Sequence, residues 1–263
     1  MRRVRATSLA SSFLIALTIA FTGAGQAQAA ATSYVALGDS YSSGVGAGSY
    51  QSGSGDCKRS NLAYPQLWAN ANSPSSFSFV ACSGATTSTV RSSQLGPLTS
   101  ATQLVSVTAG GNDVGFADVM QTCILGTSAT CLDRVATARS YMSSTLPARL
   151  DALYADIASR APSARVVVIG YPKFYDVEAI CAGLSDTKRT AINQAADQLN
   201  SVISQRAAAR GFRFGDVRPP FTGHEICSGD SWLHSLDISI GESYHPKAAG
   251  QSGGYLPVLN AND

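Results

Sequence analysis

Five short segments with the character of buried β-strands alternate with helical patterns, and this alternation restricts the folds open to the chain. The segments are Tyr34–Leu37, Phe77–Ala81, Leu104–Thr108, Arg165–Ile169 and Phe212–Asp216. The first, third and fourth are almost continuous apolar runs, which is typical of strands covered on both faces. Such an alternation predicts an α/β protein in which a central, mostly parallel sheet lies between two layers of helices.

Two long segments carry helical periodicity. Apolar residues recur at helical spacing over residues 132–160, where Pro147 predicts a break, and again over residues 186–210. Asp186 is expected to be the N-cap of the second helix, and Gly211 to end it.

The N-terminus has the three-part pattern of a secretory signal peptide. Three arginines lie within the first five residues, an apolar run covers residues 9–21, and Ala27-Gln-Ala29 offers a small-x-small cleavage site. A membrane anchor is the alternative, but the run is shorter than the ~20 residues that a span needs. We expect a signal peptide over residues 1–29, followed by one secreted domain over residues 30–263 with no integral membrane segment.

The charge of the chain is close to balanced. The full sequence has a formal net charge of +2, and removal of the N-terminal arginines brings it near zero. Neither a basic patch nor an acidic tail is present, so the sequence argues against nucleic acid as a partner. A near-neutral surface suits an uncharged or apolar substrate.

All six cysteines follow the expected signal peptide. In an oxidising compartment an even number favours disulfides, although six cysteines allow 15 pairings. A zinc site is the alternative, but the chain has no Cys-x-x-Cys pair. Because short loops close at the least entropic cost, we expect the sequential pairs Cys57–Cys82, Cys123–Cys131 and Cys181–Cys227.

Polar turns follow the first three predicted strands. They are Gly38-Asp-Ser40, the segment 82–87 and Gly110-Gly-Asn-Asp113. Ligands of parallel α/β sheets bind at the carboxyl ends of the strands, so these turns are expected to build one site.

The chemistry that fits these turns is nucleophilic catalysis by serine. A serine hydroxyl needs a base to take its proton, and the chain has three histidines. His245 precedes Pro246 in a loop after all the strands and is the expected base for Ser40. His224 and His234 are expected to have structural roles.

Acyl transfer also needs donors for the developing oxyanion. Gly84 can offer a backbone N–H, Asn112 a side-chain amide, and Ser40 its own backbone N–H. Taken singly, Gly84 and Asn112 could be ordinary turn residues.

The order of these motifs resembles the SGNH (GDSL) hydrolase family over nearly the whole mature chain. The matching blocks are Gly38-Asp-Ser40, Ser83-Gly84, Gly110-Gly-Asn-Asp113 and Tyr244-His-Pro246. The chain is most similar to secreted lipases, esterases and phospholipases of filamentous actinomycetes, which share its size and its three disulfides.

The resemblance implies a flavodoxin-like three-layer fold with a five-stranded sheet, and a serine acyl-enzyme mechanism without metal or cofactor. Ser40 then corresponds to the nucleophile, His245 to the base, and Ser40, Gly84 and Asn112 to the oxyanion hole. The resemblance further implies a monomer that acts on lipid or other esters, with a lipid–water interface as one setting.

The sequence departs from the family at the acid behind the base. The family commonly has Asp three residues before the histidine, and this chain has Glu242. Either Glu242 orients His245, or a backbone carbonyl such as that of Ser243 does so and leaves a Ser–His dyad. Among the other acids, Asp39 is expected to anchor the turn below Ser40, and Asp113 to cap the helix that follows it.

The expected substrate is a lipid ester, cleaved by a lipase or esterase, with a phospholipase A-type activity as one form. Aromatic residues after strand ends are expected to line an acyl groove: Tyr41, Phe116, Tyr171 and Phe174. A carbohydrate acetylesterase of the same fold is the first alternative. A secreted binding module with a dead site is the second, and the intact Ser, Gly, Asn and His set argues against it.

Overall fold

The computed structural model describes Met1 and residues 32–263. Apart from Met1, the expected signal peptide lies outside the described residues. In the described part, no helix combines the length and the hydropathy needed to cross a membrane. The elements, in chain order, are β1 (Ser33–Gly38), α1 (Ser40–Ser43), η1 (Ser52–Cys57), α2 (Tyr64–Asn72), β2 (Ser76–Phe79), α3 (Thr87–Ser93), β3 (Leu104–Thr108), α4 (Phe116–Leu125), α5 (Ser128–Ser144), α6 (Leu146–Arg160), β4 (Arg165–Ile169), α7 (Asp186–Ala209), β5 (Arg213–Gly215), α8 (Arg218–Phe221), η2 (Ile240–Glu242), the π-helical turn η3 (Gly250–Tyr255) and α9 (Leu256–Asn260).

The five strands form one sheet in the order β2-β1-β3-β4-β5, and every neighbouring pair is parallel. The predicted α/β fold with a five-stranded parallel sheet is therefore confirmed. The strand order reverses between β1 and β3, so the turns that follow these two strands flank a crevice at the carboxyl edge. Ser40 follows β1 and Asn112 follows β3.

Three strands differ from their predicted bounds: β1 is one residue longer at each end, and β2 begins one residue earlier, at Ser76. β2 ends at Phe79 rather than Ala81, because the backbone N–H groups of Val80 and Ala81 both donate to the carbonyl of Ala36 as the chain leaves the ladder. β5 is shorter than predicted at both ends and covers only Arg213–Gly215. The third and fourth strands have the predicted bounds.

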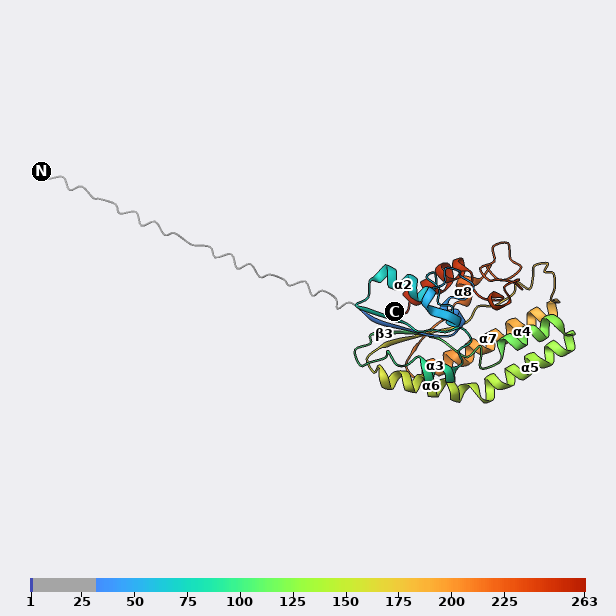
Figure 1. The fold of residues 1–263 in the computed structure, drawn as a ribbon, viewed down its shortest axis with the longest axis horizontal. Coiled ribbons are helices and arrows are strands. Elements are labelled where there is room, and N and C mark those ends of the chain that lie inside the picture. Colours follow the sequence, from blue (N-terminus) through green and yellow to red (C-terminus); the bar gives the residue numbers. More distant parts are fainter. Residues whose placement is uncertain (2–31) are drawn as a thin grey trace. The chain divides into compact units, whose positions relative to one another are not determined.

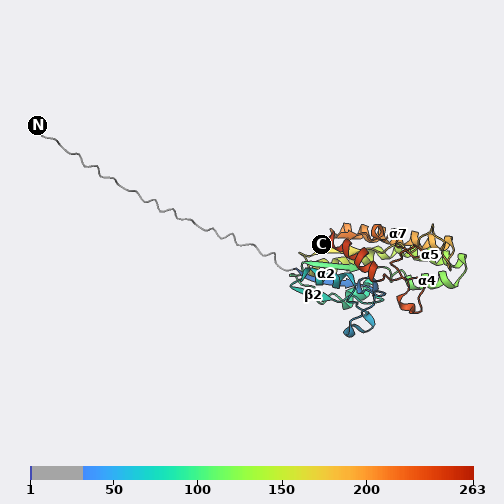
Figure 2. The same ribbon diagram turned by 90° about the horizontal axis from the view of Figure 1, so that it is seen from above.

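Helices cover both faces of the sheet (Figure 1). α3, α6 and α7 lie on one face, and α2 and α8 lie on the other together with the C-terminal turns. α4 and α5 extend beyond the carboxyl edge, beside α7, and the view from above in Figure 2 shows them in the same place. α5 packs against both α4 and α7.

The two long helical patterns fold as helices with the predicted break. α5 ends at Ser144 and α6 begins at Leu146, with Pro147 in the first turn of α6, where no N–H donor is required. The prediction that Asp186 caps α7 is wrong. Ser185 is the N-cap, and Asp186 is the first helical residue, where its carboxylate pairs with the Arg189 guanidinium.

The described cysteines pair sequentially, as Cys57–Cys82, Cys123–Cys131 and Cys181–Cys227. The first pair joins η1 to the turn after β2, and the second joins α4 to α5. The third joins the segment before α7 to the segment after α8. Each of the three therefore ties a segment near the carboxyl edge of the sheet.

Candidate active site

The turn between β1 and α1 can only be built with glycine at its first position. Gly38 has φ of 126°, and a Cβ there would lie 2.6 Å from the carbonyl oxygen of Thr108. The buried side chain of Gln94 accepts from the Gly38 N–H at 2.8 Å and donates to the Gly38 carbonyl at 2.9 Å. The backbone conformation of Gly38 and its two hydrogen bonds with Gln94 fix the path of the chain into Asp39 and Ser40.

Asp39 is the N-cap of α1, which agrees with its predicted role as an anchor of the turn. Its Oδ1 accepts from the N–H of Tyr41 at 3.0 Å and from the hydroxyl of Thr108 at 3.0 Å. Burial raises the pKa of Asp39 to about 6, against the opposing effect of these donors.

Ser40 is the first residue of α1, and its hydroxyl meets His245. The Nε2 atom of His245 lies 2.8 Å from Oγ of Ser40. Burial lowers the pKa of His245 to about 4, so the imidazole is neutral near pH 7 and can accept a proton. A serine hydroxyl and a neutral imidazole are thus in direct contact.

The carboxylate of Glu242 is hydrogen-bonded to a residue outside this pair. It accepts a hydrogen bond from the Tyr50 hydroxyl at 2.7 Å. Nδ1 of His245 is buried, and among the described residues no group meets full hydrogen-bond geometry with it. The backbone carbonyls of Ser243 and Glu242 nevertheless raise the pKa of His245, and the Ser243 contribution is the larger.

The loop that carries His245 is held by its own backbone. Tyr244 adopts a left-handed φ of 66°. Its N–H donates to the carbonyl of His234, and the N–H of His234 donates to the carbonyl of His245. This backbone pairing holds the loop, and a structural or surface role was expected for His234.

Gly84 and Asn112 lie on the same cavity as Ser40 and His245. Gly84 has φ of 77°, which suits its turn after β2. The side-chain amide of Asn112 donates to the carbonyl of Ala85 at 3.0 Å. That bond fixes the orientation of the amide and ties the two turns to each other.

Asp113 caps a helix, but not the predicted one. α4 begins at Phe116 after Gly115, which is in the left-handed region. The carboxylate of Asp113 instead accepts from the N–H and the hydroxyl of Thr87, at 2.9 and 2.6 Å, at the start of α3. The acid therefore links the turn after β3 to the helix after β2.

A cavity of about 630 Å³ extends from Ser40 and His245 into the layer of α4, α5 and α7. The four aromatic residues predicted to line an acyl groove all line it. The prediction missed the aliphatic lining from the three helices, which includes Val119, Met120, Ile124, Met142, Ala196 and Leu199. The helical spacing of Val119, Met120 and Cys123 in 116–125 was the available signal.

Known proteins are similar to this chain over most of its length. The model of the GDSL-like Lipase/Acylhydrolase family matches residues 36–252. Lipase 1 of Streptomyces coelicolor is 64% identical over 99% of both chains.

Two solved structures are also similar to this chain. The crystal structure of phospholipase A1 from Streptomyces albidoflavus has a TM-score of 0.87 and is 65% identical, and that of an extracellular lipase from Streptomyces rimosus has a TM-score of 0.87 and is 59% identical. Each alignment covers 89% of this chain and 100% of the other. The chain belongs to the GDSL-like lipase/acylhydrolase family and is an ester hydrolase.

Proposed function

We propose that the chain is a secreted lipase or phospholipase A-type enzyme that cleaves lipid esters through an acyl-enzyme on Ser40. The Oγ of Ser40 attacks the ester carbonyl while Nε2 of His245 takes its proton. The oxyanion receives the N–H groups of Ser40 and Gly84 and the free amide hydrogen of Asn112. His245 then protonates the leaving alcohol, and later accepts a proton from the water that releases the fatty acid.

The carbonyl of Ser243, rather than the carboxylate of Glu242, orients the base in this proposal. Two observations support it: Glu242 accepts a hydrogen bond from Tyr50, and the backbone of Ser243 raises the pKa of His245 more than that of Glu242 does. The base then works as part of a Ser–His dyad. The mechanism uses no metal and no cofactor.

The observation that carries the lipid assignment is the cavity. Most of its lining residues beyond Ser40 and His245 are aliphatic or aromatic, and its volume of about 630 Å³ lies within the usual range of ligand pockets. An acetyl group would leave most of this apolar wall uncovered, which argues against a carbohydrate acetylesterase. The similarity to a phospholipase A1 supports the inclusion of phospholipids in the proposal.

A panel of nitrophenyl esters from acetate to palmitate, with phosphatidylcholine beside it, tests the proposal. The rate should rise beyond acetate as the acyl chain fills the cavity. Ser40→Ala and His245→Ala should each lower kcat by roughly 10³–10⁶-fold while the protein stays folded. A sharp optimum at acetate would refute the lipid assignment, and near-full activity of either variant would refute the assigned roles.

The rim of the cavity suits a lipid surface. Leu125, Leu236 and Ile240 line the cavity and are 77%, 57% and 77% exposed, and Ile238 between them is fully exposed. Neither α4 nor residues 236–242 contain lysine or arginine. We therefore propose adsorption to uncharged or zwitterionic lipid, since an anionic surface would meet no cation on these segments.

Export and a monomeric state complete the proposal. Three cysteine pairs suit an oxidising compartment, and the N-terminal pattern predicts cleavage after Ala29. N-terminal sequencing of the protein from culture medium tests the cleavage site. Light scattering of the purified enzyme tests the monomer.

A further inference from the structure

The hydroxyl of Tyr171 touches both turns of the site described above. It follows β4 and is 3% exposed. Its hydroxyl donates to Oδ2 of Asp39 at 2.5 Å and accepts the N–H of Gly111 at 3.1 Å. Asp39 precedes Ser40, and Gly111 precedes Asn112, so one oxygen atom joins the turn of the nucleophile to the turn of the oxyanion donor.

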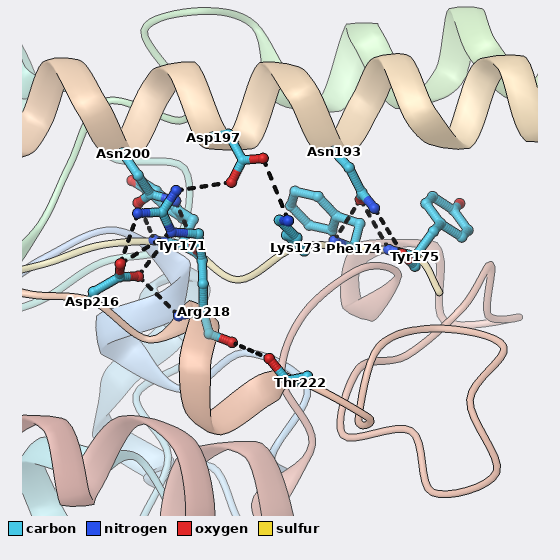
Figure 3. A network of polar contacts seen from close by, with 10 residues as sticks. All are labelled: Tyr171, Lys173, Phe174, Tyr175, Asn193, Asp197, Asn200, Asp216, Arg218 and Thr222. Carbon is cyan, nitrogen blue, oxygen red and sulfur yellow. Dashed lines mark hydrogen bonds and ion pairs between the residues drawn. The ribbon is translucent and has the colours of Figure 1, made fainter. Parts of the chain in front are cut away.

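The backbone of Tyr171 is itself fixed to α7. The side-chain amide of Asn200 accepts from the Tyr171 N–H at 2.8 Å and donates to the Tyr171 carbonyl at 2.7 Å (Figure 3). Asn193, two turns earlier on the same helix, holds Phe174 and Tyr175 in the same way. The segment 171–175 is therefore clamped along α7, and the ring of Tyr171 has little freedom to move.

We propose that Tyr171 is a positioning residue that sets the distance between the Ser40 nucleophile and the Asn112 amide. The inference rests on the proposed roles of those two residues. Preorganised donors lose their effect when they are displaced, and a misplacement of about 1 Å can cost about 10²-fold in rate. Tyr171 was predicted to line the acyl groove, and its ring does so, but the hydroxyl has this second task.

The hydrogen bond from Tyr171 also tunes Asp39. Among the groups that oppose the burial of this carboxyl, the hydroxyl of Tyr171 lowers its pKa most. Five titratable groups on the surrounding elements interact with Asp39, so that its pKa or theirs is shifted: Tyr41, Tyr64, Asp113, Tyr171 and Tyr255. Loss of the Tyr171 hydroxyl should therefore raise the pKa of Asp39 above its present value near 6.

Protonated Asp39 cannot accept all three of its present hydrogen bonds as a carboxylate does. The turn should loosen as pH falls through the pKa of Asp39. The loosened turn should lower kcat, so the pH profile of kcat should fall on its acid side (the acid limb). In Tyr171→Phe this acid limb should lie at higher pH than in the wild type. A residue that serves stability alone would not move that limb.

The test compares wild type, Tyr171→Phe and Tyr154→Phe with nitrophenyl butyrate across the pH range. Tyr154 is equally buried, and its hydroxyl has no hydrogen-bond partner among the described residues, so Tyr154→Phe controls for loss of a buried hydroxyl. We expect Tyr171→Phe to lower kcat 10- to 100-fold with KM changed less than twofold, and to shift the acid limb upward. Tyr154→Phe should behave as the wild type.

Wild-type kcat in Tyr171→Phe, an equal loss in Tyr154→Phe, or a change confined to KM would each overturn the inference. If Tyr171→Phe does not fold, Asp39→Asn replaces it. That variant removes the titrating group and should lose the acid limb near pH 6, and retention of that limb would also overturn the inference. Failure of the wild type to hydrolyse any ester would instead refute the proposed function.

Discussion

The imidazole of His245 contacts the hydroxyl of Ser40 at 2.8 Å, although 205 positions separate the two residues in the chain. Ser40 is held by the Gly38 turn, which Gln94 clamps, and His245 by the backbone pairing of its loop with His234. The contact is thus made by two independently supported turns. Its chemistry depends on the imidazole remaining neutral.

The first prediction concerns this neutrality and stability. The folded-state pKa of His245 is about 4, below the ordinary value near 6.5, so the unfolded chain binds the proton first as pH falls. Stability should be lost between about pH 6.5 and pH 4, by roughly 1–3 kcal/mol, since one edge of the imidazole faces the cavity. Denaturant unfolding at pH 7 and pH 4 should show this loss as a difference between the wild type and His245→Gln, because the raised pKa of Asp39 contributes an opposite change that both proteins share. Equal losses in both would contradict it.

The second prediction concerns Glu242. Because its carboxylate accepts from Tyr50 rather than from His245, Glu242→Gln should lower kcat less than tenfold. Tyr50→Phe removes the partner of the same contact and should have a similarly small effect. Steady-state kinetics with nitrophenyl butyrate measures both. A fall of three orders of magnitude in Glu242→Gln would mean that the carboxylate orients the base, as misorientation costs ~10⁴ in a well-studied triad.

The third prediction concerns Asn112. Its amide donates to the Ala85 carbonyl, and the residue lines the cavity. Asn112→Ala should lower kcat by roughly 10²–10³-fold with little change in KM, because an oxyanion donor acts mainly in the transition state. Thr102→Ala, which removes a buried hydroxyl that accepts from the Thr99 N–H and does not line the cavity, separates this effect from loss of stability. Comparable kcat losses in the two variants would contradict the assignment.

The strands and their turns could be predicted because their signals are local. An apolar run predicts a buried strand, and Gly38-Asp-Ser40 or Gly110-Gly-Asn-Asp113 directly after it predicts a polar turn at the strand end. Local signals alone gave wrong capping predictions for two aspartates. Asp113 and Asp186 each stand just before or at a helix start, but Asp113 reaches Thr87 of α3 and Asp186 pairs with Arg189.

The supporting contacts were beyond prediction because they join distant positions. Gln94 clamps Gly38 from 56 residues away, and Asn200 clamps Tyr171 from 29 residues away. A glutamine or asparagine within a helical pattern carries no sign of such a partner. The cavity also depends on contacts between segments that are distant in the sequence, since it arises from the packing of α4 and α5 against α7.

The fourth prediction concerns acyl-chain length. Ala196 lines the cavity from α7 and is 5% exposed, so a larger side chain there takes space from the acyl group. Ala196→Phe should lower the palmitate rate at least tenfold relative to the butyrate rate and move the optimum to shorter chains. The butyrate rate of the same variant is the internal control, because overpacking costs about 1–3 kcal/mol of stability. A proportional loss on every ester would mean that the acyl chain does not reach Ala196.

The fifth prediction concerns adsorption to lipid. Ile238 is fully exposed and does not line the cavity, but its neighbours Leu236 and Ile240 do. Burial of an isoleucine side chain is worth about 1.5–3 kcal/mol, so Ile238→Ser should weaken binding to vesicles about tenfold or more. Sedimentation with vesicles of ether-linked phosphatidylcholine, which the enzyme cannot hydrolyse, measures this without turnover.

Ile238→Leu keeps the apolar side chain and serves as the matched control for that experiment, with adsorption close to that of the wild type. Hydrolysis of nitrophenyl butyrate in solution should be unchanged in both variants, since Ile238 lies outside the cavity. Vesicles that contain anionic lipid should bind the wild type no more tightly than zwitterionic ones, because residues 236–242 carry Asp237 and Glu242 and no cation. Unweakened adsorption of Ile238→Ser, or a parallel loss in Ile238→Leu, would show that the loop does not meet the lipid surface.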